Sequence, residues 1–385
     1  MNNSSFKKIP NNIKNLQLKN RENLYGYSYH DRYIKKLQKK DLDKEDPHYI
    51  STYSSFLGEV YENIIYELLL EFALKSKDIT RFILKGPHQK NNHNNKNGLM
   101  IDRNQQIVYK AGYKDVTEFD ALFFTKDSVY FVESTIVKTT TSLRKRLKKK
   151  RSLLEVLFPN LQVKALIILS EGALGVNVFP HYCDVWVTNS LDDHDLINSL
   201  IYKKEKTEHK FHKLEHKKFI NAHEVRVHNF KYFENLAWVL KTSRKPTNKS
   251  TVDMEFFCSK KLSLYFDIYS KLYIGYITSD TLVRLLKFLN IQKISQDIPI
   301  EQITDDQIMV TLEKNKTKFE LIYYLKILNG KLKKLEVKGD VLDVSDKDPK
   351  GFTASETKYI RYVFKEKYKF SLENIQNLLS KNFFN

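Results

Sequence analysis

The stretch EFDALFFTKDSVYFVEST, residues 118–135, decides the fold class of this chain. Two runs of aromatic, β-branched and other apolar residues flank the polar turn Lys126-Asp127-Ser128, and this pattern is typical of a β-hairpin. We therefore expect paired strands at 116–125 and 129–137. Each strand carries one acidic residue among apolar neighbours, Asp120 in the first and Glu133 in the second.

The segments around the hairpin predict an α/β core. Apolar residues recur at helical spacing over 53–75, which indicates one long amphipathic helix. A second helix, with leucines on one face and basic residues on its other sides, follows the hairpin and ends before Pro159. Further strands are expected at 79–84, 107–113, 163–169 and 185–187, and a further helix at 191–202.

Changes in composition divide the 385 residues into four segments. The first is a basic extension rich in Lys and Asn, with weak periodicity and little expected stability of its own. The α/β core follows, then a basic linker or connecting helix, and then an α+β domain that ends in helices. The expected boundaries are 1–50, 51–205, 206–250 and 251–385.

The charge of the chain favours a polyanionic partner. There are 65 Lys and Arg residues against 46 Asp and Glu, a formal net charge of +19. Such a surplus attracts nucleic acid and gains free energy from counterion release. No signal peptide, membrane span or cysteine framework is recognisable, so we expect an intracellular protein, cytoplasmic or nucleoid-associated and not secreted. The sequence leaves open whether the chain forms a homodimer or a larger complex.

Carboxylates are the strongest indication of chemistry. Pairing of the hairpin strands would bring Asp120 and Glu133 side by side, and a carboxylate in an apolar run needs solvent or a cation. Glu59 and Glu62 share one face of the long helix. Carboxylates from a helix and two strands would form an oxygen cage suited to Mg²⁺ or Mn²⁺.

These motifs resemble the PD-(D/E)xK nuclease superfamily, over roughly residues 51–202. Gly58-Glu59-Val60-Tyr61-Glu62 resembles the helix opening of Holliday-junction resolvases and related restriction-type nucleases. The resemblance implies a restriction-endonuclease-like mixed sheet flanked by helices. It also implies metal ligation by Glu62, with Glu59 in reserve, by Asp120 and Glu133, and by the main-chain carbonyl of Ser134.

One position departs from the superfamily's pattern. Glu133-Ser134-Thr135 occupies the place of the E-x-K motif, so Thr135 stands where the family has its catalytic lysine. A lysine from the end of the strand, Lys138, or from the next helix would have to replace it. Of the helix candidates Lys145, Lys148 and Lys149, the helical distance favours Lys148.

The predicted function is hydrolysis of phosphodiester bonds in DNA or RNA by a metal-dependent endonuclease. The basic helix after the hairpin would contact phosphates. The missing lysine supports an alternative, a nuclease-like core without catalysis that binds nucleic acid or serves assembly. A basic structural protein that only docks onto partners is the third reading. The expected phosphate-contacting residues are Arg144, Lys145, Lys148, Lys149 and Arg151.

Overall fold

The computed structural model forms two compact units, Met1–Phe230 and Lys231–Asn385. In the first unit the structure describes residues 6–38, 45–89, 97–111, 114–202, 214 and 216–228. In the second it describes 244–245, 248–252, 264, 267–268, 271–276, 293–294, 308–315, 318–326, 332–338 and 341–344.

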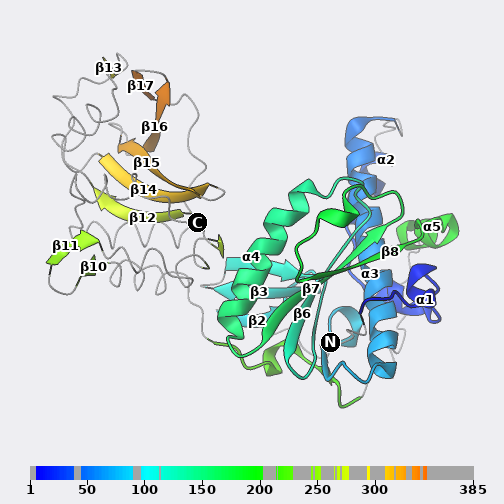
Figure 1. The fold of residues 1–385 in the computed structure, drawn as a ribbon. Helices are drawn as coiled ribbons and strands as arrows, with labels where there is room; N and C mark the ends of the chain where they lie inside the picture. Colours follow the sequence, from blue (N-terminus) through cyan, green and yellow to red (C-terminus); the bar gives the residue numbers. More distant parts are fainter. Residues whose placement is uncertain are drawn as a thin grey trace. The chain divides into compact units, whose positions relative to one another are not determined.

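A six-stranded mixed sheet forms the centre of the first unit, with the order β8-β7-β6-β5-β1-β9 (Figure 1). The predicted hairpin is present, because β5 and β6 pair antiparallel. β6, β7 and β8 run parallel to one another, and the runs of apolar residues in them suit burial on both faces of the sheet. The strands are β1 (Arg81–Ile83), β5 (Ala121–Phe124), β6 (Ser128–Thr135), β7 (Gln162–Ser170), β8 (Cys183–Thr188) and β9 (Phe219–Ile220).

The long predicted helix is α3 (Pro47–Lys75), and it begins six residues earlier than the apolar pattern indicated. Asp46 caps it, since its side chain accepts hydrogen bonds from the backbone N–H groups of His48 (2.7 Å) and Tyr49 (3.3 Å). Pro47 at the first helical position fits this start, because proline has no N–H to leave unpaired.

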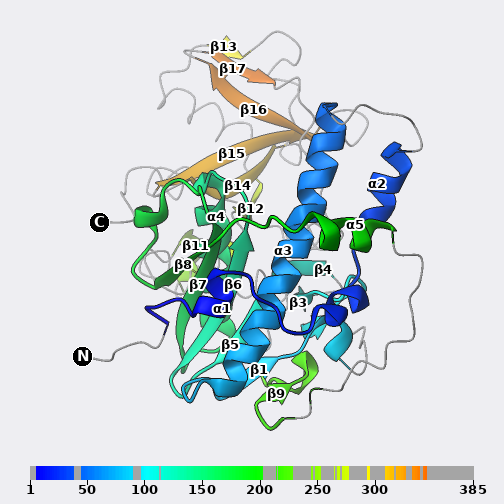
Figure 2. The ribbon, with the colours of Figure 1, turned by 90° about the vertical axis from the view of Figure 1, so that its right-hand side faces the viewer.

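Helices cover both faces of the central sheet. α3 lies on one face and α4 (Thr141–Leu157) on the other, as Figure 1 shows, and Figure 2 shows α3 running along the sheet. Alternation along the strands provides an apolar layer for each helix. α5 (His194–Tyr202) adds apolar side chains to the α3 side.

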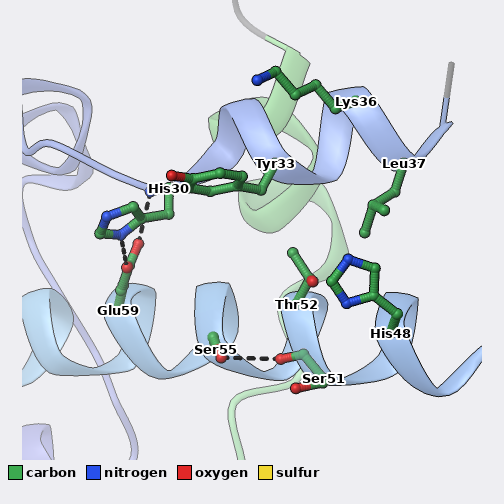
Figure 3. Close-up of a pocket in the computed structure, with 9 residues that line it drawn as sticks. All are labelled: His30, Tyr33, Lys36, Leu37, His48, Ser51, Thr52, Ser55 and Glu59. Carbon is green, nitrogen blue, oxygen red and sulfur yellow. Dashed lines mark hydrogen bonds and ion pairs between the residues drawn. The ribbon is translucent and has the colours of Figure 1, made fainter. Parts of the chain in front are cut away.

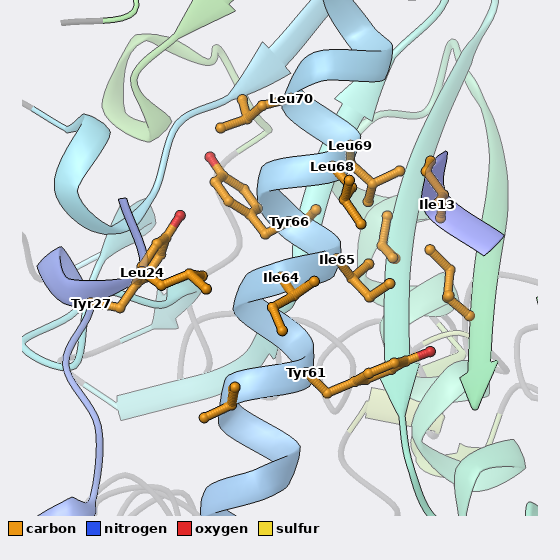
Figure 4. Close-up of a cluster of buried hydrophobic side chains, with 14 of the residues drawn as sticks. Ile13, Leu24, Tyr27, Tyr61, Ile64, Ile65, Tyr66, Leu68, Leu69 and Leu70 are labelled. Atoms are coloured by element: carbon orange, nitrogen blue, oxygen red, sulfur yellow. The ribbon is translucent and has the colours of Figure 1, made fainter. Parts of the chain in front are cut away.

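The main core lies between α3 and the sheet, and residues of the N-terminal segment belong to it (Figure 4). This differs from the basic extension expected for 1–50. Phe6 is buried, with its ring 4.7 Å from that of Tyr130, and its carbonyl accepts a 2.6 Å hydrogen bond from the Trp186 indole. Single apolar residues scattered among Lys and Asn carry no periodicity, so the pattern of the sequence does not predict this packing. The N-terminal elements are α1 (Asn11–Lys14), η1 (Arg21–Gly26) and α2 (Asp31–Gln38).

The first predicted hairpin strand is divided in two at Asp120. β4 (Lys114–Phe119) belongs to a separate antiparallel sheet with β2 (Gly98–Ile101) and β3 (Ile107–Ala111), whereas β5 begins at Ala121 in the central sheet. Asp120 therefore lies at the point where the chain passes from one sheet to the other.

The second unit contains a β-sheet with the order β12-β14-β15-β16-β17-β13 and a two-stranded pair, β10-β11. Most of the linker expected at 206–250 and the helices expected after 353 lie outside the described residues. No helix in the described part of the chain is long and apolar enough to span a membrane. The strand bounds are β10 (Arg244–Lys245), β11 (Asn248–Val252), β12 (Lys271–Tyr276), β13 (Lys293–Ile294), β14 (Ile308–Asn315), β15 (Lys318–Lys326), β16 (Leu332–Lys338) and β17 (Val341–Val344).

Candidate functional site

The β5–β6 hairpin brings Asp120 beside the end of β6. The register pairs Ala121 with Val132, so the next residues outward, Asp120 and Glu133, follow directly from the last pair of the ladder. Asp120 Oδ2 accepts hydrogen bonds from the Ser134 backbone N–H (2.6 Å) and the Ser134 hydroxyl (3.0 Å). The two donors fix the orientation of the Asp120 carboxylate.

Glu133 is buried and forms an ion pair with Lys150 of α4. Glu133 and Lys150 are only 4% and 5% exposed at their side chains. Glu133 directly follows the apolar run 129–132 of β6 and is buried, so its charge needs a partner within the protein. A buried carboxylate paired with a buried ammonium is a costly arrangement that marks a candidate functional site.

Glu62 of α3 forms a second ion pair, with Lys85, which lies two residues after the end of β1. The Lys85 side chain is completely buried, and its Nζ atom also donates a 2.9 Å hydrogen bond to the Gln106 side-chain carbonyl. The same ammonium lies 5.1 Å from the ring centre of Tyr66. The Glu62 side chain is 19% exposed, so the Glu62 end of the pair is in contact with solvent while the Lys85 end is buried.

The charges of the two ion pairs act on one another. Burial raises the pKa of Glu62, the Lys85 ammonium opposes this rise, and the charge of Asp120 adds to it. Burial lowers the pKa of Lys150, while the negative charges of Asp120, Glu118 and Glu62 act in the opposite direction. Negative charges from α3, from β4 and from the bend at Asp120 thus all act on Lys150.

The carboxylates do not form a ready cation cage. Among the residues that the structure describes, no three His, Cys, Asp or Glu side chains are grouped so that they could hold a metal ion. Glu62 and Glu133 are each paired with an ammonium group, that of Lys85 and that of Lys150. The donor chemistry still suits a hard cation, because carboxylate oxygens are the ligands that Mg²⁺ and Mn²⁺ prefer. Binding of such a cation requires Lys85 or Lys150 to move away from its carboxylate.

Glu59, the predicted reserve ligand, points to a different neighbour. Its carboxylate accepts a 2.9 Å hydrogen bond from the His30 backbone N–H and pairs with the His30 ring. Glu59 and His30 line a pocket between α2 and α3 (Figure 3). Of the two helix glutamates, Glu62 is therefore the one that the structure brings to Asp120.

The lysines of the site are not those that the sequence favoured. Lys148 and Lys138 are exposed, and Thr135, which is half-buried at the end of β6, accepts a 3.1 Å hydrogen bond from the Val137 backbone N–H. Lys150 takes the inward position because α4 turns its leucine face to the sheet, and Lys150 lies on that face. The signal was present in the sequence, since Lys150 occurs at the spacing of the buried leucines Leu143, Leu147, Leu154 and Leu157.

Lys85 was also missed. It directly follows the apolar run 79–84 and is buried like its neighbours. A lysine that continues an apolar strand, without a turn in between, is a signal comparable to Glu133 in its own run.

The basic residues of α4 differ in how far their side chains are exposed. Arg144 and Lys148 are exposed, and Lys149 is half-buried. Arg151 pairs with Glu155 at 3.0 Å and lies 4.2 Å from the ring centre of Tyr182. The side chain of Lys145 lies outside the described part of the chain.

Comparison of the chain with protein-family models, with curated proteins and with solved structures gave no match.

Proposed function

We propose that this chain is a metal-dependent nuclease with a PD-(D/E)xK-type site, in a restriction-endonuclease-like core. The observation that carries the proposal is the hairpin register that sets Asp120 beside Glu133, together with the ion pair between Glu133 and the buried lysine Lys150. The charge of Asp120 also acts on Glu62 of α3. Carboxylates from a helix and a hairpin, together with a lysine, are the groups that the superfamily uses. Lys150 supplies from α4 the ammonium that Thr135 lacks.

Each residue has a chemical role in this proposal. Asp120 and Glu133, with Glu62, would hold Mg²⁺ or Mn²⁺, and Ser134 keeps the Asp120 carboxylate in place. The cation, when bound, lowers the pKa of water and neutralises phosphate charge. Released from Glu133, the Lys150 ammonium would stabilise the negative charge that develops on the phosphoryl oxygens. The exposed basic residues of α4 would bind the phosphates on either side.

The two ion pairs favour a second candidate function. If Lys85 and Lys150 stay on Glu62 and Glu133, the carboxylates are neutralised and the site holds the core together without catalysis. The chain would then be a nucleic-acid-binding or assembly module that has kept the architecture of a nuclease.

Cleavage assays separate the two functions. The purified chain is incubated with single-stranded, duplex and branched DNA and RNA in the presence of Mg²⁺, Mn²⁺ or EDTA. We expect metal-dependent cleavage that falls about 10²-fold or more in Asp120→Asn and in Lys150→Met, as when one charge-stabilising group is removed from an active site. Lys126→Ala is the matched control, because Lys126 is exposed in the turn at the far end of the same hairpin.

The outcomes differ clearly. Cleavage that depends on metal and on both residues supports the nuclease. Binding of nucleic acid without cleavage by the wild type, in any metal, contradicts it and supports the non-catalytic module.

A further inference from the structure

A pocket lined by aromatic, charged and hydroxyl side chains lies between α2 and α3. It measures about 600 Å³, and its walls come from the two helices and from His30, the residue that precedes α2. In Figure 3 the Tyr33 ring lies on the α2 side of the pocket, and the turn of α3 that carries Thr52 and Ser55 lies opposite. The volume falls in the range of small-ligand sites, about 300–1,000 Å³.

Tyr33 is the residue that points to a stacking ligand. It is one of the large apolar side chains that stay exposed, at 43%, although it lies inside a pocket. Its ring stacks on the His30 imidazole, with the two ring centres 5.8 Å apart, which fixes the orientation of the tyrosine. An aromatic ring that is held in place and partly open to solvent is what proteins use to stack unpaired bases.

Polar groups at both ends of the pocket suit the edges and the phosphate of a nucleotide. Glu59 lies at one end, where each of its carboxylate oxygens binds His30 and keeps a second lone pair that can accept a hydrogen bond from an amino-bearing base edge. His48 lies toward the other end in Figure 3. Lys36 also lines the pocket, with its Nζ atom 5.9 Å from the ring centre of Tyr33. Positive charge beside an aromatic surface favours a base with its phosphate attached.

The pocket lies next to Glu62 along α3. Glu62 belongs to the candidate catalytic cluster, by which we mean Glu62, Asp120, Glu133 and Lys150. Glu59 belongs to the pocket and Glu62 to the cluster, and three residues of an α-helix advance by about 4.5 Å along its axis. A strand whose phosphate lies at the cluster therefore has its neighbouring nucleotide within reach of the pocket.

We propose that the pocket between α2 and α3 binds one unpaired base of the substrate strand, stacked on Tyr33, beside the bond that is cleaved. The proposal rests on the nuclease function proposed above and specifies its substrate as a strand with at least one unstacked base. Glu59, which the sequence suggested as a metal ligand, here reads the edge of that base.

Strands with a single abasic site test the proposal. A set of oligonucleotides, each with the abasic site at a different position, is titrated against the full chain with Ca²⁺ in place of Mg²⁺, and binding is followed by fluorescence anisotropy. We expect one position at which the missing base weakens binding about 5- to 100-fold, the range that corresponds to the loss of one base stacked on an aromatic ring. In Tyr33→Leu this dependence on position disappears, whereas Tyr33→Phe keeps it.

Several results would overturn the proposal. One is equal dependence on the abasic position in the wild type and in Tyr33→Leu, with folding of both verified by circular dichroism. Another is binding of nucleoside monophosphates through Tyr33 without tighter binding of any strand, which would make the ligand a free nucleotide. Because binding is measured without turnover, a chain that binds in this way but never cleaves contradicts the nuclease function and leaves the base pocket supported.

Discussion

Lys150 of α4 and Glu133 of β6 form an ion pair in the interior of the first unit, where both side chains are almost completely buried. The pair joins the helix to the sheet at the point where the chain also places Asp120. A buried pair of this kind contributes little net stability, but removal of one partner leaves an uncompensated charge. The consequences for stability and for catalysis can be separated by mutation.

Lys150→Met should destabilise the fold more than the small change in side-chain volume suggests. It leaves Glu133 charged and buried, which costs about 3–5 kcal/mol of unfolding free energy. Glu133→Gln on the same background removes the charge and should recover most of this loss. Urea denaturation of the two single variants and the double variant measures the coupling as a double-mutant cycle. Losses that simply add would contradict the buried ion pair.

Thr135→Lys should restore activity to Lys150→Met. Thr135 lies two residues after Glu133 on β6, so a lysine there projects from the same face of the strand. The chain would then carry the E-x-K motif with the lysine in its usual place. The measurement is the cleavage rate of the double variant against Lys150→Met alone. No recovery, with the folds intact, would mean that Lys150 does not stand in for the motif's lysine.

The pH dependence of cleavage should be bell-shaped and narrow. Burial raises the pKa of Glu62, so the carboxylate becomes protonated at a higher pH than an ordinary glutamate, and activity that needs its charge falls as the pH drops through this raised value. Burial lowers the pKa of Lys150, so the ammonium is lost at a lower pH than in an ordinary lysine. Cleavage rates measured across the pH range check both limbs. Limbs at about 4.3 and about 10.4, the values of unperturbed side chains, would contradict the prediction.

Gly86→Ala should disturb the segment that holds Lys85. Gly86 has φ +62°, and a Cβ there would clash with the Tyr27 ring. That ring cannot easily move, because its hydroxyl donates a 2.6 Å hydrogen bond to the buried Glu67. We expect a loss of about 1–3 kcal/mol from backbone strain and overpacking, measured by thermal or urea unfolding.

Gly58→Ala is the matched control for this change. Gly58 lies within α3, and a Cβ there meets nothing within 4 Å. The substitution should raise stability by up to about 1 kcal/mol, since alanine favours a helix more than glycine does. Equal losses in the two variants would show that the contact with Tyr27 is not the cause.

Phe6→Ala tests whether the N-terminal segment belongs to the core. Phe6 is 2% exposed and packs against Phe123 and Tyr130, with ring centres 5.4 and 4.7 Å apart. Its truncation should cost about 3–5 kcal/mol, whereas Lys8→Ala, at an exposed position of the same segment, should change stability by less than about 0.5 kcal/mol. A loss below about 1 kcal/mol for Phe6→Ala would favour a loosely attached extension.

The sequence by itself determined the α/β character of the first unit and the proximity of Asp120 to Glu133. Both follow from local rules, because two short apolar strands joined by a polar turn pair with each other, and the turn sets their register. It also determined α3, whose buried residues Tyr61, Ile64 and Leu68 follow the predicted spacing.

Only the tertiary structure decided which cations face these carboxylates. Seven of the eight residues 144–151 are basic. The leucine spacing puts Lys150 on the buried face of α4, but only the packing of α4 against the sheet brings that face to Glu133. Lys85 reaches Glu62 across 23 residues of sequence, and the N-terminal segment enters the core without any periodic pattern. Contacts between elements depend on how whole helices and sheets pack, which a local pattern of residues does not encode.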